Sequence, residues 1–202
     1  MQTLLDEGRT WIVDADLKSY FDTIPKARLM RRIEERIADT RVLALLQSYL
    51  DQEVMEELTR HAPTDQGTPQ GAVISPLLAN IYLDPLDHLL AESGVEMVRY
   101  ADDFVLLGRS EEEAKAALAR VQTWIEANGL TLHPEKTRLV DATQPGGFDF
   151  LGYHFERGYR WPRRKALDRL KETVRTLTPR TSGKSLEATI TRLSKDPRGK
   201  PP

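Results

Sequence analysis

The sequence predicts an α+β domain in which helices cover one face of a small antiparallel sheet. The stretch 10–17 alternates apolar and acidic residues, which is the period of a half-buried strand. The stretch 95–107 has two apolar runs on either side of Ala-Asp-Asp, as in a β-hairpin with carboxylates at its tip. Helical patterns lie between and after these strands. This order of elements favours helices packed on an antiparallel sheet.

Two helices are expected after the first strand. Pro25 opens one with apolar residues at helical spacing, and Asp39 is a suitable N-cap for the next. The segment 52–66 has weak periodicity and leads into the Gly- and Pro-containing stretch GTPQG. We therefore expect a variable connection that ends in a tight loop.

A third helix is expected to run from Ser75 to about Leu90. Ser75 and Pro76 suit its N-cap and first position, and Pro85 predicts a kink or a break. Ser110 caps a fourth helix, which closes at 128–129. Short strand candidates follow at 130–133, 137–140 and 148–155. A basic helix is expected from beyond residue 162 to about residue 177.

Composition excludes several kinds of chemistry. The 202 residues contain no cysteine and four scattered histidines, so disulfides, thiolate zinc sites and cysteine nucleophiles are excluded, and a histidine metal site is not suggested. Any bound metal must then rely on oxygen ligands. The chain has neither an apolar run of membrane-spanning length nor a signal pattern, and we expect a cytoplasmic protein without a membrane partner.

The net charge of −2 conceals two parts of opposite sign. Residues 157–202 hold 14 Lys and Arg against 4 Asp and Glu, whereas residues 1–156 hold 15 against 27. A basic arm on an acidic body is consistent with phosphate contacts beside a cation-binding centre. A solvated charge run without function is the alternative.

Three aspartates are the candidate metal ligands. Asp102 and Asp103 repel each other at a hairpin tip unless a cation offsets their charge, and Asp16 at the end of a strand could supply a third ligand. Carboxylates and phosphates suit Mg²⁺, and two such ions support in-line phosphoryl transfer. A solvated turn is the alternative, because Asp-Asp pairs are common on surfaces.

Four segments in order resemble the reverse transcriptases encoded by group II introns and their bacterial relatives. They are DADLKSYFDTI at 14–24, GTPQGAVISPLLANIYLDPLD at 67–87, RYADDFVLL at 99–107, and GLTLHPEKT with FDFLGYHF beyond it. The block with PQG and SPLLANIYLD is the most discriminating. The resemblance implies a reverse-transcriptase palm for residues 1–158 and the start of a helical thumb or maturase region for 159–202. The composition of the last residues, DPRGKPP, predicts a disordered tail.

The resemblance assigns roles to residues. Asp16, Asp102 and Asp103 would hold two Mg²⁺ ions, with Mn²⁺ as an alternative, and Lys136 would protonate the leaving pyrophosphate unless it is only a solvent-facing lysine. Phe21 would exclude a 2′-hydroxyl unless it is a core aromatic. The other nucleotide-binding candidates are Leu17, Pro69, Gln70 and Gly71. The primer and template candidates are Tyr100, Phe150, Leu151, Gly152, Arg163, Arg164 and Lys165, of which 150–152 could instead be sheet core.

The implied function is an RNA-directed DNA polymerase that acts on an RNA template, a DNA primer and deoxynucleotides. The sequence also departs from the family pattern: the fingers segment is missing, Pro25-Lys26 replaces the usual Asp-His, and no endonuclease segment follows the short thumb. A separate fingers-bearing polypeptide could therefore be a partner. The alternative is an inactive RNA-binding or maturase remnant that binds group II intron RNA. The host element, whether intron, retron, CRISPR locus or defence system, stays open.

Overall fold

A computed structural model describes residues 1–51, 54–56, 59–61, 65–68 and 73–179, followed by positions 181, 183, 185, 187, 188, 190 and 191. The described chain forms two compact units, Met1–Val140 and Asp141–Pro202. The connection expected at 52–66 contains an antiparallel strand pair that the sequence analysis missed, β2 (Val54–Glu56) and β3 (Thr59–His61). Strands of three residues are too short to show an alternating pattern. None of the described helices could span a bilayer.

The first unit is built on a four-stranded sheet with the order β4-β5-β1-β6. Its strands are β1 (Trp11–Asp16), β4 (Glu96–Tyr100), β5 (Asp103–Gly108) and β6 (Arg138–Asp141). The central strand β5 pairs antiparallel with both β1 and β4. The predicted hairpin is therefore confirmed, and β1 lies beside the strand that carries the aspartate pair.

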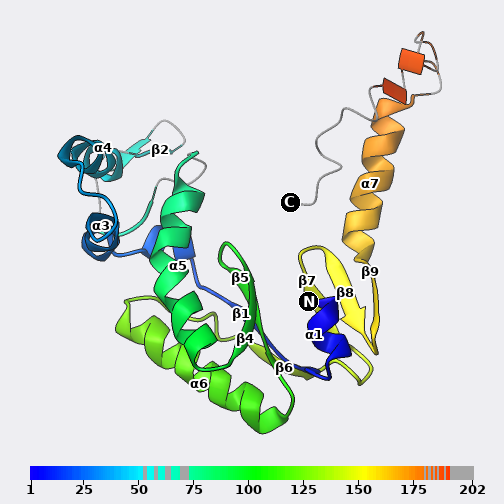
Figure 1. Cartoon of the computed structure of the whole chain (residues 1–202). Coiled ribbons are helices and arrows are strands. Elements are labelled where there is room, and N and C mark those ends of the chain that lie inside the picture. The colour runs from blue at the N-terminus through cyan, green and yellow to red at the C-terminus, as the bar shows by residue number, and fades with distance from the viewer. Residues whose placement is uncertain are drawn as a thin grey trace. The chain divides into compact units, whose positions relative to one another are not determined.

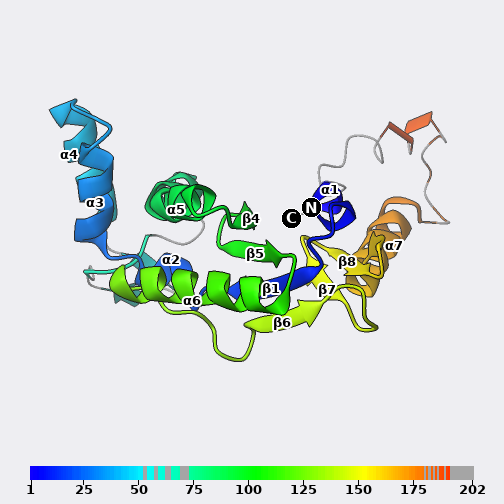
Figure 2. The same cartoon turned by 60° about the horizontal axis from the view of Figure 1, so that its bottom comes forward.

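Helices cover one face of this sheet. Figures 1 and 2 show α5 (Ser75–Glu92) beside β4 and α6 (Glu111–Ala127) running along β1 and β5. Val13 and Ala15 of β1 and Phe104 and Leu106 of β5 are buried in the core that these helices close. Burying side chains of this size supplies most of the stability of such a layer. The predicted α+β architecture is confirmed.

Further helices extend the layer. The helix α3 (Lys26–Glu34) packs on α5 and on α4 (Thr40–Leu50), and short α1 (Gln2–Asp6) and α2 (Tyr20–Thr23) flank β1 along the chain. The predicted cap at Asp39 is confirmed, because its carboxylate accepts hydrogen bonds from the Arg41 and Val42 amides. The Ser110 hydroxyl likewise accepts from the Glu113 amide.

The start of α5 lies one residue away from its predicted position. Ser75 is the first helical residue and Ile74 occupies the N-cap, so the prediction of Ser75 as the cap was wrong. The helix then continues through Pro85 to Glu92, so of the predicted kink or break at Pro85 the break does not occur. Helix ends are set by local hydrogen bonds that tertiary contacts can displace by a residue.

The second unit contains an antiparallel sheet of β7 (Phe148–Phe150), β8 (Tyr153–Glu156) and β9 (Tyr159–Pro162). The rings of Phe148 and Phe155 stack with their centroids 5.1 Å apart, which gives this small sheet its core. The helix α7 (Arg164–Leu177) confirms the basic helix predicted after Pro162. Leu177 at its end is buried.

Candidate active site

The strand register brings two of the predicted metal ligands together. Asp16 at the end of β1 lies directly opposite Asp103 at the start of β5. Directly opposed residues of an antiparallel pair have Cα atoms about 4.5–5.5 Å apart. Side chains alternate between faces along a strand, so Asp14, Asp16 and Asp103 share the face opposite the helix-covered core. Sequence segments that are far apart thus meet at one end of the sheet.

Asp102 lies beside this pair, in the turn that joins β4 to β5. Tyr100 and Asp103 are paired, so Ala101 and Asp102 form a two-residue hairpin turn. Ala101 has a φ of 56°, a left-handed conformation that hairpin turns usually assign to Gly, Asn or Asp. Tyr100 is 57% exposed next to the turn, so its ring is available to a ligand.

Burial and mutual repulsion alter the acidity of the aspartates. Partial burial, reinforced by the charges of Asp14, Asp16 and Asp102, raises the pKa of Asp103 to about 6. Partial burial and the charge of Asp16 also raise the pKa of Asp102, while Lys136 opposes this. A cluster of this kind stores unfavourable charge that a bound cation would offset.

Two basic side chains reach the cluster from the segment after α6. The Lys136 ammonium lies 2.6 Å from Asp16 Oδ2, and the hydrogen bond to Asp16 raises the pKa of Lys136. Arg138 Nη2 donates to Asp14 Oδ2 at 2.6 Å, a contact that the sequence analysis missed. The predicted lysine therefore lies at the carboxylates, in contact with one of the candidate metal ligands.

The donor set suits a hard divalent cation in its chemistry. It consists of carboxylates, the ligands that Mg²⁺ and Mn²⁺ prefer. The negative charges that help to raise the pKa of Asp103 are those that a bound cation would offset. Among the described residues, however, no three acidic or histidine side chains are gathered closely enough to form a metal cage. Lys136 Nζ donates a hydrogen bond to Asp16 Oδ2, an oxygen of one candidate metal ligand.

The predicted nucleotide-binding residues have different surroundings. Phe21 is partly exposed, packs against the core and lies 5.5 Å from the Tyr20 ring. The Leu17 side chain is buried, and its backbone forms a bridge with Leu132. Pro69, Gln70 and Gly71 lie outside the described residues.

The predicted primer-binding residues, apart from Tyr100, belong to the second unit. Leu151 and Gly152 form the two-residue turn between β7 and β8, with φ values of 48° and 81°, and Phe150 before them is buried. The Arg163 amide donates to the Gly152 carbonyl at 2.9 Å, and the Arg163 guanidinium pairs with Asp149. Beyond it, Arg164 and Lys165 are exposed at the start of α7.

Comparisons with known proteins agree with this geometry. The family model "Reverse transcriptase (RNA-dependent DNA polymerase)" matches residues 2–155. Protein YkfC of Escherichia coli is 31% identical over 76% of this chain and 50% of its own length. The group II intron-encoded protein LtrA of Lactococcus lactis is 39% identical over 42% of this chain and 14% of its own length. The chain thus spans half or less of the length of these curated relatives.

Solved structures share the fold. A telomerase of Candida tropicalis superposes with a TM-score of 0.61 over 79% of this chain and 37% of its own, at 16% identity. A foamy viral protease-reverse transcriptase in complex with RNA/DNA hybrid gives 0.53 over 93% of this chain and 21% of its own, at 19% identity. Because the family model matches more than half of the chain, residues 2–155, this chain belongs to the reverse transcriptase family. The relative from a group II intron confirms the branch of the family that the motifs predicted.

Proposed function

We propose that this chain is the catalytic palm of an RNA-directed DNA polymerase that joins a deoxynucleotide to a primer 3′-hydroxyl. The observation that carries the proposal is the pairing of Asp16 with Asp103 beside the Asp102 turn, on the face of the sheet that the core helices do not cover. In this proposal residues 1–158 form the palm and residues 159–202 open the thumb.

Asp16, Asp102 and Asp103 would hold the two divalent ions. The ions would supply Lewis-acid activation of the hydroxyl and neutralise phosphate charge. The Lys136 ammonium lies 2.6 Å from Asp16 Oδ2, and we assign it the role of proton donor to the leaving pyrophosphate. Phe21 and the segment 69–71 would contact the deoxynucleotide.

The proposed partners are an RNA template and a DNA primer, with Tyr100, 150–152 and 163–165 as contacts. Arg164 and Lys165 are exposed and can meet phosphates. Group II intron RNA and a separate polypeptide that bears the fingers are further proposed partners, and we place the protein in the cytoplasm.

A second function is favoured by one observation. The Lys136 ammonium donates to Asp16 Oδ2, an oxygen of a candidate metal ligand, at 2.6 Å. A non-catalytic chain that binds RNA as a maturase would be consistent with this contact. Such a chain should bind structured RNA with a logarithmic salt slope of about −0.9 per phosphate contact on a duplex, and it should incorporate no nucleotide.

The test is primer extension by the full chain on an RNA template, with Mg²⁺ or Mn²⁺ and all four deoxynucleotides. We expect extension by the parent, and a loss of at least about 100-fold in Asp102→Asn. Asp51→Asn is the matched control, because Asp51 ends α4 and accepts a hydrogen bond from Gln47 outside the cluster. Equal extension by Asp102→Asn would reject the assignment, and salt-dependent RNA binding without extension by the parent would favour the maturase function.

A further inference from the structure

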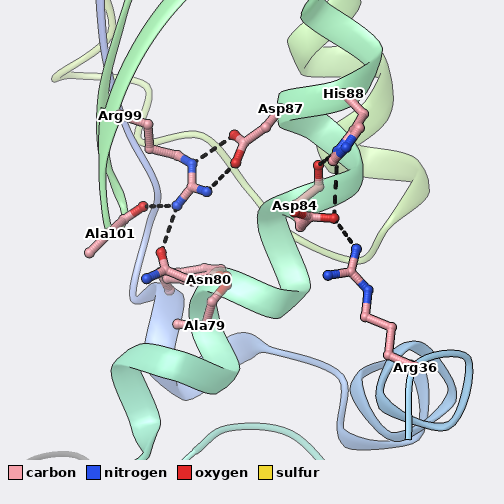
Figure 3. Close-up of polar contacts among 9 residues, drawn as sticks. Arg36, Ala79, Asn80, Asp84, Asp87, His88, Arg99 and Ala101 are labelled. Carbon is pink, nitrogen blue, oxygen red and sulfur yellow. Dashed lines mark hydrogen bonds and ion pairs between the residues drawn. The ribbon is translucent and has the colours of Figure 1, made fainter.

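The guanidinium of Arg99 links the Ala101–Asp102 turn to helix α5. Arg99 Nη1 donates to the Ala101 carbonyl oxygen at 2.8 Å and to Asn80 Oδ1 at 2.8 Å. Arg99 Nε donates to Asp87 Oδ1 at 2.8 Å, and Nη2 donates to the other oxygen of the same carboxylate. Figure 3 shows this single side chain linking the turn to two residues of α5.

Each partner fixes a different part of the guanidinium. Asn80 and Asp87 are seven residues apart, which is two helical turns, so they lie on the same face of α5. The bidentate contact with Asp87 sets the plane of the guanidinium, and the contact with Asn80 orients its free end. The Arg99 side chain is only 12% exposed, so these contacts have little competition from water. The hydrogen bond and charge of Asp87 outweigh burial and raise the pKa of Arg99, which stays charged.

The turn needs such support. Ala101 has a φ of 56°, and residues with a Cβ rarely adopt this conformation unless surrounding contacts impose it. The contact from Arg99 lies on the carbonyl of that same residue, immediately before Asp102. The turn also carries concentrated negative charge, since Asp102 and Asp103 repel Asp16 across the sheet. Without a tie to α5, strain and repulsion would both favour rearrangement.

We propose that Arg99, fixed by Asp87 and Asn80, is a positioning residue that holds Asp102 and Asp103 in the geometry required for metal binding and nucleotide transfer. This inference rests on the proposed function for its catalytic consequence and on the contacts alone for the geometry of the turn. Lysine cannot replace Arg99, because one ammonium cannot span a carboxylate, an amide and a carbonyl at fixed angles.

The same helix offers a matched control. Arg36, which follows α3, pairs with Asp84 of α5, three residues before Asp87, and Figure 3 shows that this contact lies apart from the Ala101 turn. Arg36→Met therefore removes an arginine–aspartate pair from α5 without touching Ala101. Asn80→Ala is a milder test variant than a change at Arg99, since Asn80 is exposed and Arg99 keeps its aspartate.

The first measurement is the backbone order parameter of residues 101–103 from ¹⁵N relaxation in Arg99→Lys, Asn80→Ala and Arg36→Met. We expect about 0.85 in the parent and in Arg36→Met, with a fall towards about 0.6 in Arg99→Lys and a smaller fall in Asn80→Ala. An unchanged order parameter in Arg99→Lys, or in Asn80→Ala if Arg99→Lys does not fold, would overturn the inference. No nucleotide or metal is needed, so this result does not depend on the proposed function.

The second measurement is Mn²⁺ binding by electron paramagnetic resonance, followed by primer extension. The dissociation constant should rise about tenfold in Arg99→Lys, and kcat should fall while KM for the deoxynucleotide stays constant. A purely structural role would lower the melting temperature of Arg99→Lys and Arg36→Met alike and leave Mn²⁺ affinity unchanged, which would overturn the positioning role. Failure of the parent itself to bind Mn²⁺ would count against the proposed function, while the order parameters would still decide the role of Arg99 in the turn.

Discussion

Two hairpin turns in this chain have the same length and are stabilised in different ways. The turn 101–102 and the turn 151–152 each contain two residues, and each begins with a residue other than glycine at positive φ, Ala101 or Leu151. The second turn places a glycine at its other position and closes with a backbone hydrogen bond from Arg163. The first turn has an aspartate there, and it is held through Arg99 by side chains of α5.

The difference between the two turns lies in the charge that the first one carries. The turn 151–152 carries no carboxylate, and its second residue, Gly152, adopts a positive φ with little strain. The turn 101–102 leads into two carboxylates, Asp102 and Asp103, beside Asp16, and Arg99 holds it through the Ala101 carbonyl. Regions that break a local rule and are held by their surroundings are typical of functional sites.

The largest expected effect on stability is in the second unit, at Gly147. A Cβ there would lie 2.0 Å from the Phe155 carbonyl oxygen, so the backbone of β8 must move. We expect Gly147→Ala to destabilise the unit by about 3–5 kcal/mol. Gly158→Ala is the control, because Gly158 also has a positive φ but a Cβ there would meet no atom within 4 Å, and this change should cost about 1 kcal/mol.

Hydrogen exchange of the amides in 148–162 measures both changes, since it reports the second sheet by itself. Equal protection of these amides from exchange in Gly147→Ala and Gly158→Ala would contradict the prediction, because it would show that the Phe155 backbone does not lie close to Gly147.

The next effect tests the cost of charge in the first unit. The folded-state pKa of Asp103 is about 6, above the value near 3.9 of a free aspartate, so the folded state binds its proton more tightly. Stability should therefore fall as pH rises from about 4 to about 6 and then level off. Asp103→Asn removes this loss, and after allowance for solvent screening it should stabilise the chain by about 1 kcal/mol at pH 7 and by almost nothing at pH 4.

Urea denaturation at the two pH values checks this sign. Asp51→Asn again provides the control, since it removes a carboxylate outside the cluster. A variant Asp103→Asn that is less stable than the parent at pH 7 would mean that the aspartate cluster is already compensated, and that Asp103 contributes favourable contacts instead.

The sheet and the carboxylates could be predicted from the sequence because their signals are local. The alternation in 10–17, the hairpin at 95–107 and the caps at Asp39 and Ser110 each depend on neighbouring residues. The start of α5 was harder to place, since Ile74 rather than Ser75 takes the cap. The strands at 54–56 and 59–61 were too short to give a period.

Contacts between distant segments were not predictable in the same way. Arg138 meets Asp14 only because β6 lies beside β1, and nothing in the local pattern indicates that neighbour. The contact of Arg99 with Asp87, by contrast, has a signal in the sequence. Arg99 and Met97 are two residues apart and therefore lie on the same face of β4, the face that packs on the core. A charged residue at such a position requires a partner. That signal could have directed attention to α5.

The smallest expected effect concerns Lys136, whose contact with Asp16 is exposed. Exposed ion pairs contribute little to stability, so Lys136→Met should leave the melting temperature of the chain unchanged within error. The same change frees Asp16 Oδ2 for a metal and should tighten Mn²⁺ binding by up to about fivefold, while primer extension slows because the proposed proton donor is lost. Arg138→Met, which frees Asp14 instead, is the control. Weaker Mn²⁺ binding in Lys136→Met than in Arg138→Met would show that the lysine supports the metal site rather than competing with it.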